Sequence, residues 1–117
     1  MHRVLILALT LGLAACAPPA CSESPERSAR KDVRLLVDDD GLLADAARAR
    51  LVARSGDAIA VLETGLYAAN PPARLRIVRA LAEIGSREAA PILQHLVVHD
   101  PNPDVRKAAE RAISLLR

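Results

Sequence analysis

Two histidines four residues apart, in the stretch "HLVVH", are the side chains best placed for chemistry. On a helix, the spacing of His95 and His99 brings two imidazoles to one face, where both can bind one metal ion. The metalloprotease motif requires Glu directly after the first His, and Leu96 stands there. Zinc also needs three or four protein ligands, and no third one is evident in the sequence. We therefore predict two surface histidines, with no metal, no cofactor and no catalytic residue. A metal-dependent enzyme or accessory factor that uses this pair is the alternative function.

The chain has two cysteines, five residues apart, and the segment before them has the layout of a secretory signal peptide. A basic start, "MHR", is followed by ten apolar residues, "VLILALTLGL", and then by small residues. This apolar run is too short to span a bilayer, which takes about 17–25 residues. We therefore predict that residues 1–15 are a signal peptide and are removed. The sequence contains no C-x-x-C pair, so a metal or redox site is not indicated.

The stretch "LAAC", which ends at Cys16, resembles the lipobox of bacterial lipoproteins. The resemblance implies that Cys16 carries a lipid and becomes the first mature residue, bound to a membrane of the cell envelope. The residue after Cys16 is Ala17 and not Asp. In a Gram-negative bacterium, the absence of Asp at this position favours the periplasmic side of the outer membrane. Cys21 is then a linker residue. The alternative is an ordinary signal peptide, cut near Ala15 or after Ala20, with both cysteines free to pair.

Residues 16–32 are rich in Pro, Ser and charge, and we predict that they form a disordered tether. The folded domain is then 33–117. Hydrophobic residues make up 51% of the chain, yet its only aromatic residue is Tyr67. Small aliphatic side chains favour closely packed helices over a β-sandwich. The net charge is +2, which gives no reason to expect nucleic acid as a partner.

The domain repeats itself at a nearly constant interval, which is typical of a solenoid. Residues 70–85 match 102–117 at an offset of 32, and residues 57–66 match 88–97 at an offset of 31. We predict an all-α fold: a short α-solenoid of antiparallel helix pairs with two and a half repeats. Its five helices are expected at about 41–54, 57–68, 72–84, 87–99 and 103–116.

The repeated segments resemble HEAT repeats of the type found in bilin lyases. Their pattern, D-x-x-V-R-x-x-A-x-x-A-L-x-x-I-G, is matched by "PNPDVRKAAERAISLL" and "RALAEIG", and the resemblance covers residues 40–117. Arg54 departs from it, since the pattern has isoleucine near that position. The resemblance implies a scaffold for protein–protein interaction. Related hydroxylases hold two irons with His-Glu pairs, but no His-Glu dipeptide occurs here. The lyases are far longer, and this chain lacks an aromatic pocket for a bilin.

Two arginines recur at equivalent positions of successive repeats, Arg74 and Arg106. We predict that they form an inter-repeat ladder by pairing with acids of the turns, Asp100 or Asp104. A basic stripe for nucleic acid is the alternative, but the charges of residues 33–117 nearly cancel, which argues against it.

The last predicted helix has an apolar arc that spans nearly half its circumference, with Ile113 and Leu115 at its two edges. Two interpretations remain open: this edge is a docking or self-association surface, or the helix simply caps the array. From sequence, the chain is thus predicted to be a lipid-anchored scaffold of the cell envelope. Its expected partners are a membrane, through Cys16, and another protein or a second copy.

Overall fold

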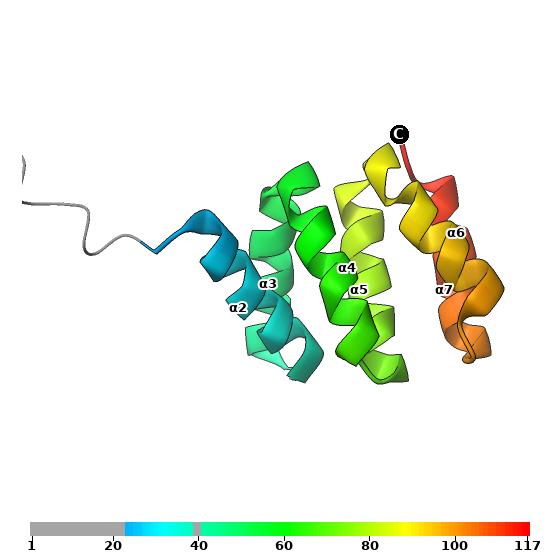
Figure 1. The fold of residues 1–117 in the computed structure, drawn as a ribbon, viewed down its shortest axis with the longest axis horizontal. Helices are drawn as coiled ribbons and strands as arrows, with labels where there is room; N and C mark the ends of the chain where they lie inside the picture. The colour runs from blue at the N-terminus through cyan, green and yellow to red at the C-terminus, as the bar shows by residue number, and fades with distance from the viewer. Residues whose placement is uncertain (1–22, 39–40) are drawn as a thin grey trace, which may run out of the picture.

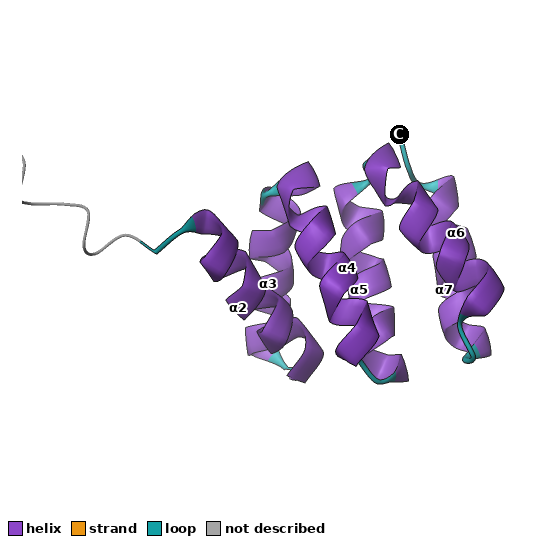
Figure 2. Ribbon diagram, viewed as in Figure 1, coloured by secondary structure: helices purple, strands orange, loops and turns teal. Residues whose placement is uncertain are grey.

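The computed structural model describes residues 23–38 and 41–117, and the regular structure in these ranges is entirely helical (Figure 2). Two 3₁₀ turns, Ser55–Ala58 and Arg87–Ala89, precede the helices α4 and α6. The α-helices are α2 (Pro25–Asp38), α3 (Leu42–Ala53), α4 (Ile59–Ala68), α5 (Pro71–Ile84), α6 (Ala90–His99) and α7 (Pro103–Ser114).

The helices form two layers, with α2, α4 and α6 in one and α3, α5 and α7 in the other (Figure 1). Consecutive helices pack as the pairs α2–α3, α4–α5 and α6–α7, and the second layer is joined by α3–α5 and α5–α7 contacts. The α2 helix lies at one end of the row, and α6 with α7 lies at the other. The predicted α-solenoid of antiparallel helix pairs is confirmed.

The core between the layers is aliphatic, as the near absence of aromatic residues predicts. Alanines supply many of its contacts, and they allow the helix axes to approach closely. The largest fully buried side chains are Leu36, Leu51, Leu62, Ile77, Val78, Leu81, Leu93 and Val105.

The repeated Asn-Pro dipeptides start α5 and α7. The Asn70 side chain accepts a hydrogen bond from the Ala73 N–H at 2.9 Å, and Asn102 accepts from the N–H groups of Asp104 and Val105. The following prolines occupy first-turn positions, where a missing N–H costs nothing. At the other end of α5, Gly85 adopts the left-handed conformation, φ 69°, that ends many helices.

The structure corrects the predicted tether, because its residues 25–32 are helical and belong to α2. Ala29, Val33 and Leu36 recur at helical spacing and are buried. This apolar stripe contains only three residues, and the residues around them are mostly charged. The composition of the segment therefore indicated a tether and not a helix. The described helices therefore number six, arranged as three pairs, where five helices and two and a half repeats were predicted.

One contact that holds α2 is an ion pair between Asp32 and Arg50 of α3. Asp32 is 4% exposed, and its Oδ1 accepts from Arg50 Nε at 2.9 Å and Nη2 at 2.7 Å. The hydrogen bond and the charge of Asp32 raise the pKa of the Arg50 guanidinium. Asp32 Oδ2 is buried and has no hydrogen-bond partner among the described residues, so this carboxylate depends on Arg50 alone.

Two further arginines hold the ends of α2. Arg54 donates to the Pro25 carbonyl at 3.0 Å and to Ser28 Oγ at 2.9 Å. Arg76 of α5 donates to the carbonyls of residues 36–37, at 2.7 and 2.8 Å. The departure of Arg54 from the HEAT-like pattern is thus explained, since its side chain reaches across to α2.

Gly65 of α4 lets α2 approach closely. A Cβ atom at this position would lie 2.6 Å from Val33 Cγ1 and 3.2 Å from Ile77 Cδ1. Because real Cβ atoms do not approach so closely, any larger residue would push α2 outward.

We expect Gly65→Ala to destabilise the domain by about 1–3 kcal/mol through overpacking, although alanine favours a helix by up to about 1 kcal/mol. Gly56→Ala is the control, since its Cβ would meet only Glu88 Oε2, at 3.5 Å. Chemical denaturation followed by circular dichroism measures both variants. Equal stability of the two would contradict the close α2–α4 contact.

Candidate interaction groove between α4 and α6

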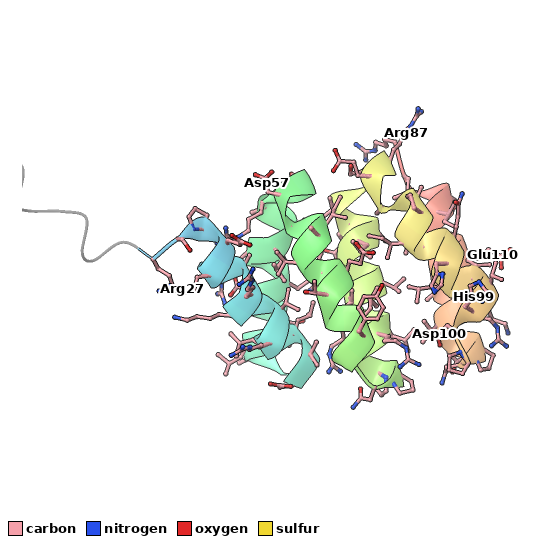
Figure 3. The ribbon with its side chains drawn as sticks, in the orientation of Figure 1. Arg27, Asp57, Arg87, His99, Asp100 and Glu110 are labelled. Atoms are coloured by element: carbon pink, nitrogen blue, oxygen red, sulfur yellow. The ribbon has the colours of Figure 1, made fainter. Side chains whose placement is uncertain are left out.

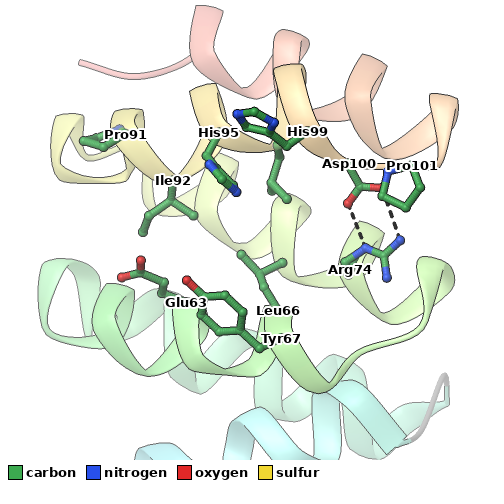
Figure 4. A pocket seen from close by; sticks show the side chains of 11 residues that line it. Glu63, Leu66, Tyr67, Arg74, Pro91, Ile92, His95, His99, Asp100 and Pro101 are labelled. Atoms are coloured by element: carbon green, nitrogen blue, oxygen red, sulfur yellow. Dashed lines mark hydrogen bonds and ion pairs between the residues drawn. The ribbon is translucent and has the colours of Figure 1, made fainter.

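An open groove of about 510 Å³ lies between α4 and α6. Figure 4 shows Glu63 and Tyr67 on the α4 side of the groove, with Ile92 and His95 across from them on α6. The lining residues are Glu63, Leu66, Tyr67, Arg74, Pro91, Ile92, His95, Leu96, His99, Asp100 and Pro101.

The repeat itself accounts for why α6 lies farther from α4 than α2 does. The groove between α4 and α6, at about 510 Å³, is larger than the hollow of about 320 Å³ between α2 and α4. Leu96 stands one full repeat after Gly65, so the position that admits α2 against α4 carries a leucine in α6. Leu96 is 7% exposed and lines the groove. The helices α4 and α6 accordingly approach less closely than α2 and α4 do.

The groove exposes the only aromatic residue of the chain. Tyr67 is 83% exposed, whereas Leu66 beside it is half-buried. On the opposite wall the rings of His95 and His99 lie 4.5 Å apart between centroids, tilted by 40°. The groove thus combines aliphatic side chains and a free aromatic ring with a polar rim.

The histidine pair lacks the ligands that a metal site would need. Across residues 23–38 and 41–117, no group of three His, Cys, Asp or Glu side chains could hold a metal ion. His95 and His99 instead form part of the groove rim. Both imidazoles can donate or accept a hydrogen bond there.

One end of the groove is closed by a buried ion pair that joins two repeats. Arg74 of α5 donates from Nε to Asp100 Oδ2 at 2.8 Å and from Nη2 to Oδ1 at 3.1 Å. The side chains are 15% and 2% exposed, respectively. The remaining Nη1 of Arg74 donates to the Ala69 carbonyl at 2.8 Å, so the guanidinium also fixes the α4–α5 turn.

Asp100 also organises the start of α7. Its Oδ1 accepts from the Asn102 N–H at 2.9 Å, and its backbone carbonyl accepts from Arg106 Nη1 at 2.6 Å. The structure therefore brings Arg74, Arg106 and Asp100 together. Asp104, the other predicted acid, is exposed in the first turn of α7, and no ion pair joins it to either arginine within the described residues.

The two residues predicted as a docking edge differ in exposure. Ile113 packs partly buried against the core, whereas Leu115 is 58% exposed just after α7 ends. Glu110 is exposed on α7 at the position where Val78, its equivalent in the preceding repeat, is buried (Figure 3). This charge makes the edge less suited to an apolar partner, and docking there stays a prediction.

Two features of the groove could have been sought in the sequence and were missed. Tyr67 is the only aromatic residue, and Leu96 stands where the preceding repeat has the small residue Gly65. Neither residue indicates a groove until it is known which helices lie side by side. Cys16, the predicted lipid site, lies outside the described residues, as do the signal peptide and Cys21.

A family model of HEAT repeats matches residues 34–114, more than two thirds of the 117 residues. The chain belongs to the HEAT-repeat family. Such repeats generally mediate protein–protein interaction and are typically non-catalytic scaffolds. No curated protein and no solved structure gives a significant match. The resemblance noted in the sequence is thus confirmed for the helical repeats.

We expect Arg74→Met to destabilise this HEAT array by about 3 kcal/mol, because it leaves the buried Asp100 carboxylate without its charged partner. Arg79→Met is the matched control: Arg79 is 72% exposed and lies 3.7 Å from Glu83, so its loss should change stability by about 0.5 kcal/mol or less. Urea denaturation compares them. If both variants unfold at the same urea concentration, the Arg74–Asp100 pair is not the link between repeats.

Proposed function

We propose that this HEAT-repeat protein is a non-catalytic interaction module that binds a short apolar helical segment of another protein in the α4–α6 groove. The observation that carries the proposal is the exposed Tyr67 ring beside an open, largely aliphatic groove. Exposed aromatic residues at the centre of such surfaces commonly supply much of the binding energy.

The groove suits a helix because it runs between two helices of the same layer. Where α2 and α4 pack together, Gly65 lets them approach closely, and the hollow left between them is about 320 Å³. Between α4 and α6, where Leu96 stands, the groove is about 510 Å³ and leaves room for a helix from outside. A partner helix with apolar residues at i, i+3 and i+4 would contact the aliphatic side chains of the groove. The polar rim, with Glu63 and the histidine pair, would then set its register through hydrogen bonds.

A photo-crosslinking amino acid at Tyr67 should give one discrete adduct in the producing cell. Val98 is the control, because it is the equivalent of Tyr67 in the next repeat and is 70% exposed but does not line the groove. We expect Ile92→Glu to abolish the Tyr67 adduct by placing a charge in the groove, and Gln94→Glu, on the exposed side of α6, to preserve it. Mass spectrometry identifies the adduct.

Equal adducts from positions 67 and 98, or an adduct that persists in Ile92→Glu, would show that the groove is not the binding surface. An adduct of twice the chain mass would show that the bound partner is a second copy of this chain and not another protein.

We also propose that the module is attached to a membrane of the cell envelope by a lipid on Cys16. The support is the lipobox "LAAC" after a basic start and ten apolar residues. Among the described helices, none is both long and apolar enough to cross a bilayer. Two or more acyl chains on one residue would anchor the chain stably, at about 0.8 kcal/mol for each buried methylene.

Cys16→Ser should move the protein from the membrane fraction to the soluble fraction, whereas Cys21→Ser should leave it membrane-bound. Intact-mass measurement of the wild-type protein should find a chain that starts at Cys16 and carries lipid. Cleavage elsewhere, or an unmodified Cys16 thiol, would disprove the anchor without affecting the groove.

A further inference from the structure

Four basic side chains lie on one exposed face of α2. Arg27, Arg30, Lys31 and Arg34 follow the spacing i, i+3, i+4, i+7, which places them on one stripe of a helix. All four are exposed, and they lie opposite the face that carries Ala29, Val33 and Leu36 into the core. We refer to these four residues as the basic face.

Half of the basic face is held by weak, exposed ion pairs, and half has none. Arg30 pairs with Glu26 and Lys31 with Glu23, each at 2.8 Å with both partners substantially exposed. Such surface pairs contribute little stability and can exchange for another anion. Within the described residues, Arg27 and Arg34 form no ion pair, so both guanidinium groups are available.

The position of this helix relative to the proposed lipid site limits where the basic face can lie. Pro25, where α2 begins, is nine residues after Cys16. Nine residues span at most about 30 Å when fully extended. A lipid on Cys16 would therefore keep α2 close to the bilayer, while α6 and α7 lie at the opposite end of the array (Figure 1).

We propose that the basic face of α2 binds the anionic phospholipid surface of the membrane to which Cys16 is attached. This inference rests on the proposed lipid anchor. The anchor supplies a high local concentration of lipid phosphate, and each nearby Lys or Arg is attracted to it within a Debye length of about 8–10 Å. The array then stands with α2 at the membrane and the α4–α6 groove within reach of a partner.

A lipid surface fits the basic face better than a folded acidic protein or a nucleic acid does. The four side chains are long, flexible and in one row. Only Arg30 and Arg34 border the hollow between α2 and α4, so the face as a whole does not form a concave site that would select a shape. The net charge of the chain is only +2, so attraction is local to α2, and the anchor strengthens it by holding α2 near the phosphates.

The two lysines of the chain provide the test, because Lys31 belongs to the basic face and Lys107 lies on α7 at the other end. The full-length lipidated protein is placed in vesicles of phosphatidylcholine, with or without phosphatidylglycerol, and treated with a water-soluble acetylating reagent. We expect phosphatidylglycerol to slow acetylation of Lys31 about fivefold relative to Lys107, and high salt to restore it.

The double variant Arg27→Glu and Arg34→Glu should remove this protection, and the matched variant Arg87→Glu and Arg111→Glu should keep it. Figure 3 shows Arg27 and Arg87 at opposite ends of the array. Equal acetylation of Lys31 in both vesicles, with the protein still membrane-bound, overturns the lipid contact but leaves the anchor intact. Protection that appears only after an acidic protein is added overturns it as well.

If intact mass shows no lipid on Cys16, the anchor itself fails, and co-sedimentation with the same vesicles then decides. Binding to phosphatidylglycerol vesicles that depends on Arg27 and Arg34 would support the lipid contact, and its absence would overturn it.

Discussion

The Arg74–Asp100 ion pair joins two successive repeats at the point where α5, α6 and α7 meet. Asp100 is almost fully buried. Its carboxylate accepts hydrogen bonds from Arg74 of the preceding repeat and from the N–H of Asn102, two residues later in the chain. The same residue's carbonyl accepts from Arg106. Because an unpaired buried carboxylate is costly, this single residue fixes how α6 turns into α7 and where α7 lies against α5. The closed end of the groove is therefore set by the same contact that sets the repeat.

Arginine has a similar role at the other end of the array. Arg50, Arg54 and Arg76 reach from α3, from its C-terminal cap and from α5 to three points along α2. Their planar guanidinium groups bind backbone carbonyls and a carboxylate with several donors at once, which a small aliphatic core needs because it offers few shape-specific contacts. Most of the arginines that suggested a nucleic-acid surface form hydrogen bonds or ion pairs within the domain. Arg27 and Arg34, whose side chains have no hydrogen-bond or ion-pair partner among the described residues, lie on the outer face of α2 and belong to the basic face.

Packing and function meet in the interface between neighbouring helices of one layer. At Gly65 the two helices approach closely, and α2 completes the array with a hollow of about 320 Å³ left beside it. At Leu96, one repeat later, the space widens into the groove of about 510 Å³. A change of one side chain between equivalent positions thus separates a structural contact from a candidate binding surface. The groove, the proposed lipid on Cys16 and the basic face of α2 are three separate features through which the molecule would contact others. In the proposed arrangement, the first binds a protein and the other two hold the array at a membrane.

The sequence by itself determined the helical repeat. Its regular period and the Asn-Pro dipeptides that start helices are local patterns, which can be recognised without knowing which residues are in contact. The HEAT resemblance and the pairing of Arg74 with a turn acid could be predicted for the same reason. The tertiary structure alone decided that residues 25–32 are helical, since three buried aliphatic residues among charged ones become a signal only when α3, α4 and α5 cover them. It also decided that Tyr67 faces a groove, because whether two helices touch depends on the side chains of both.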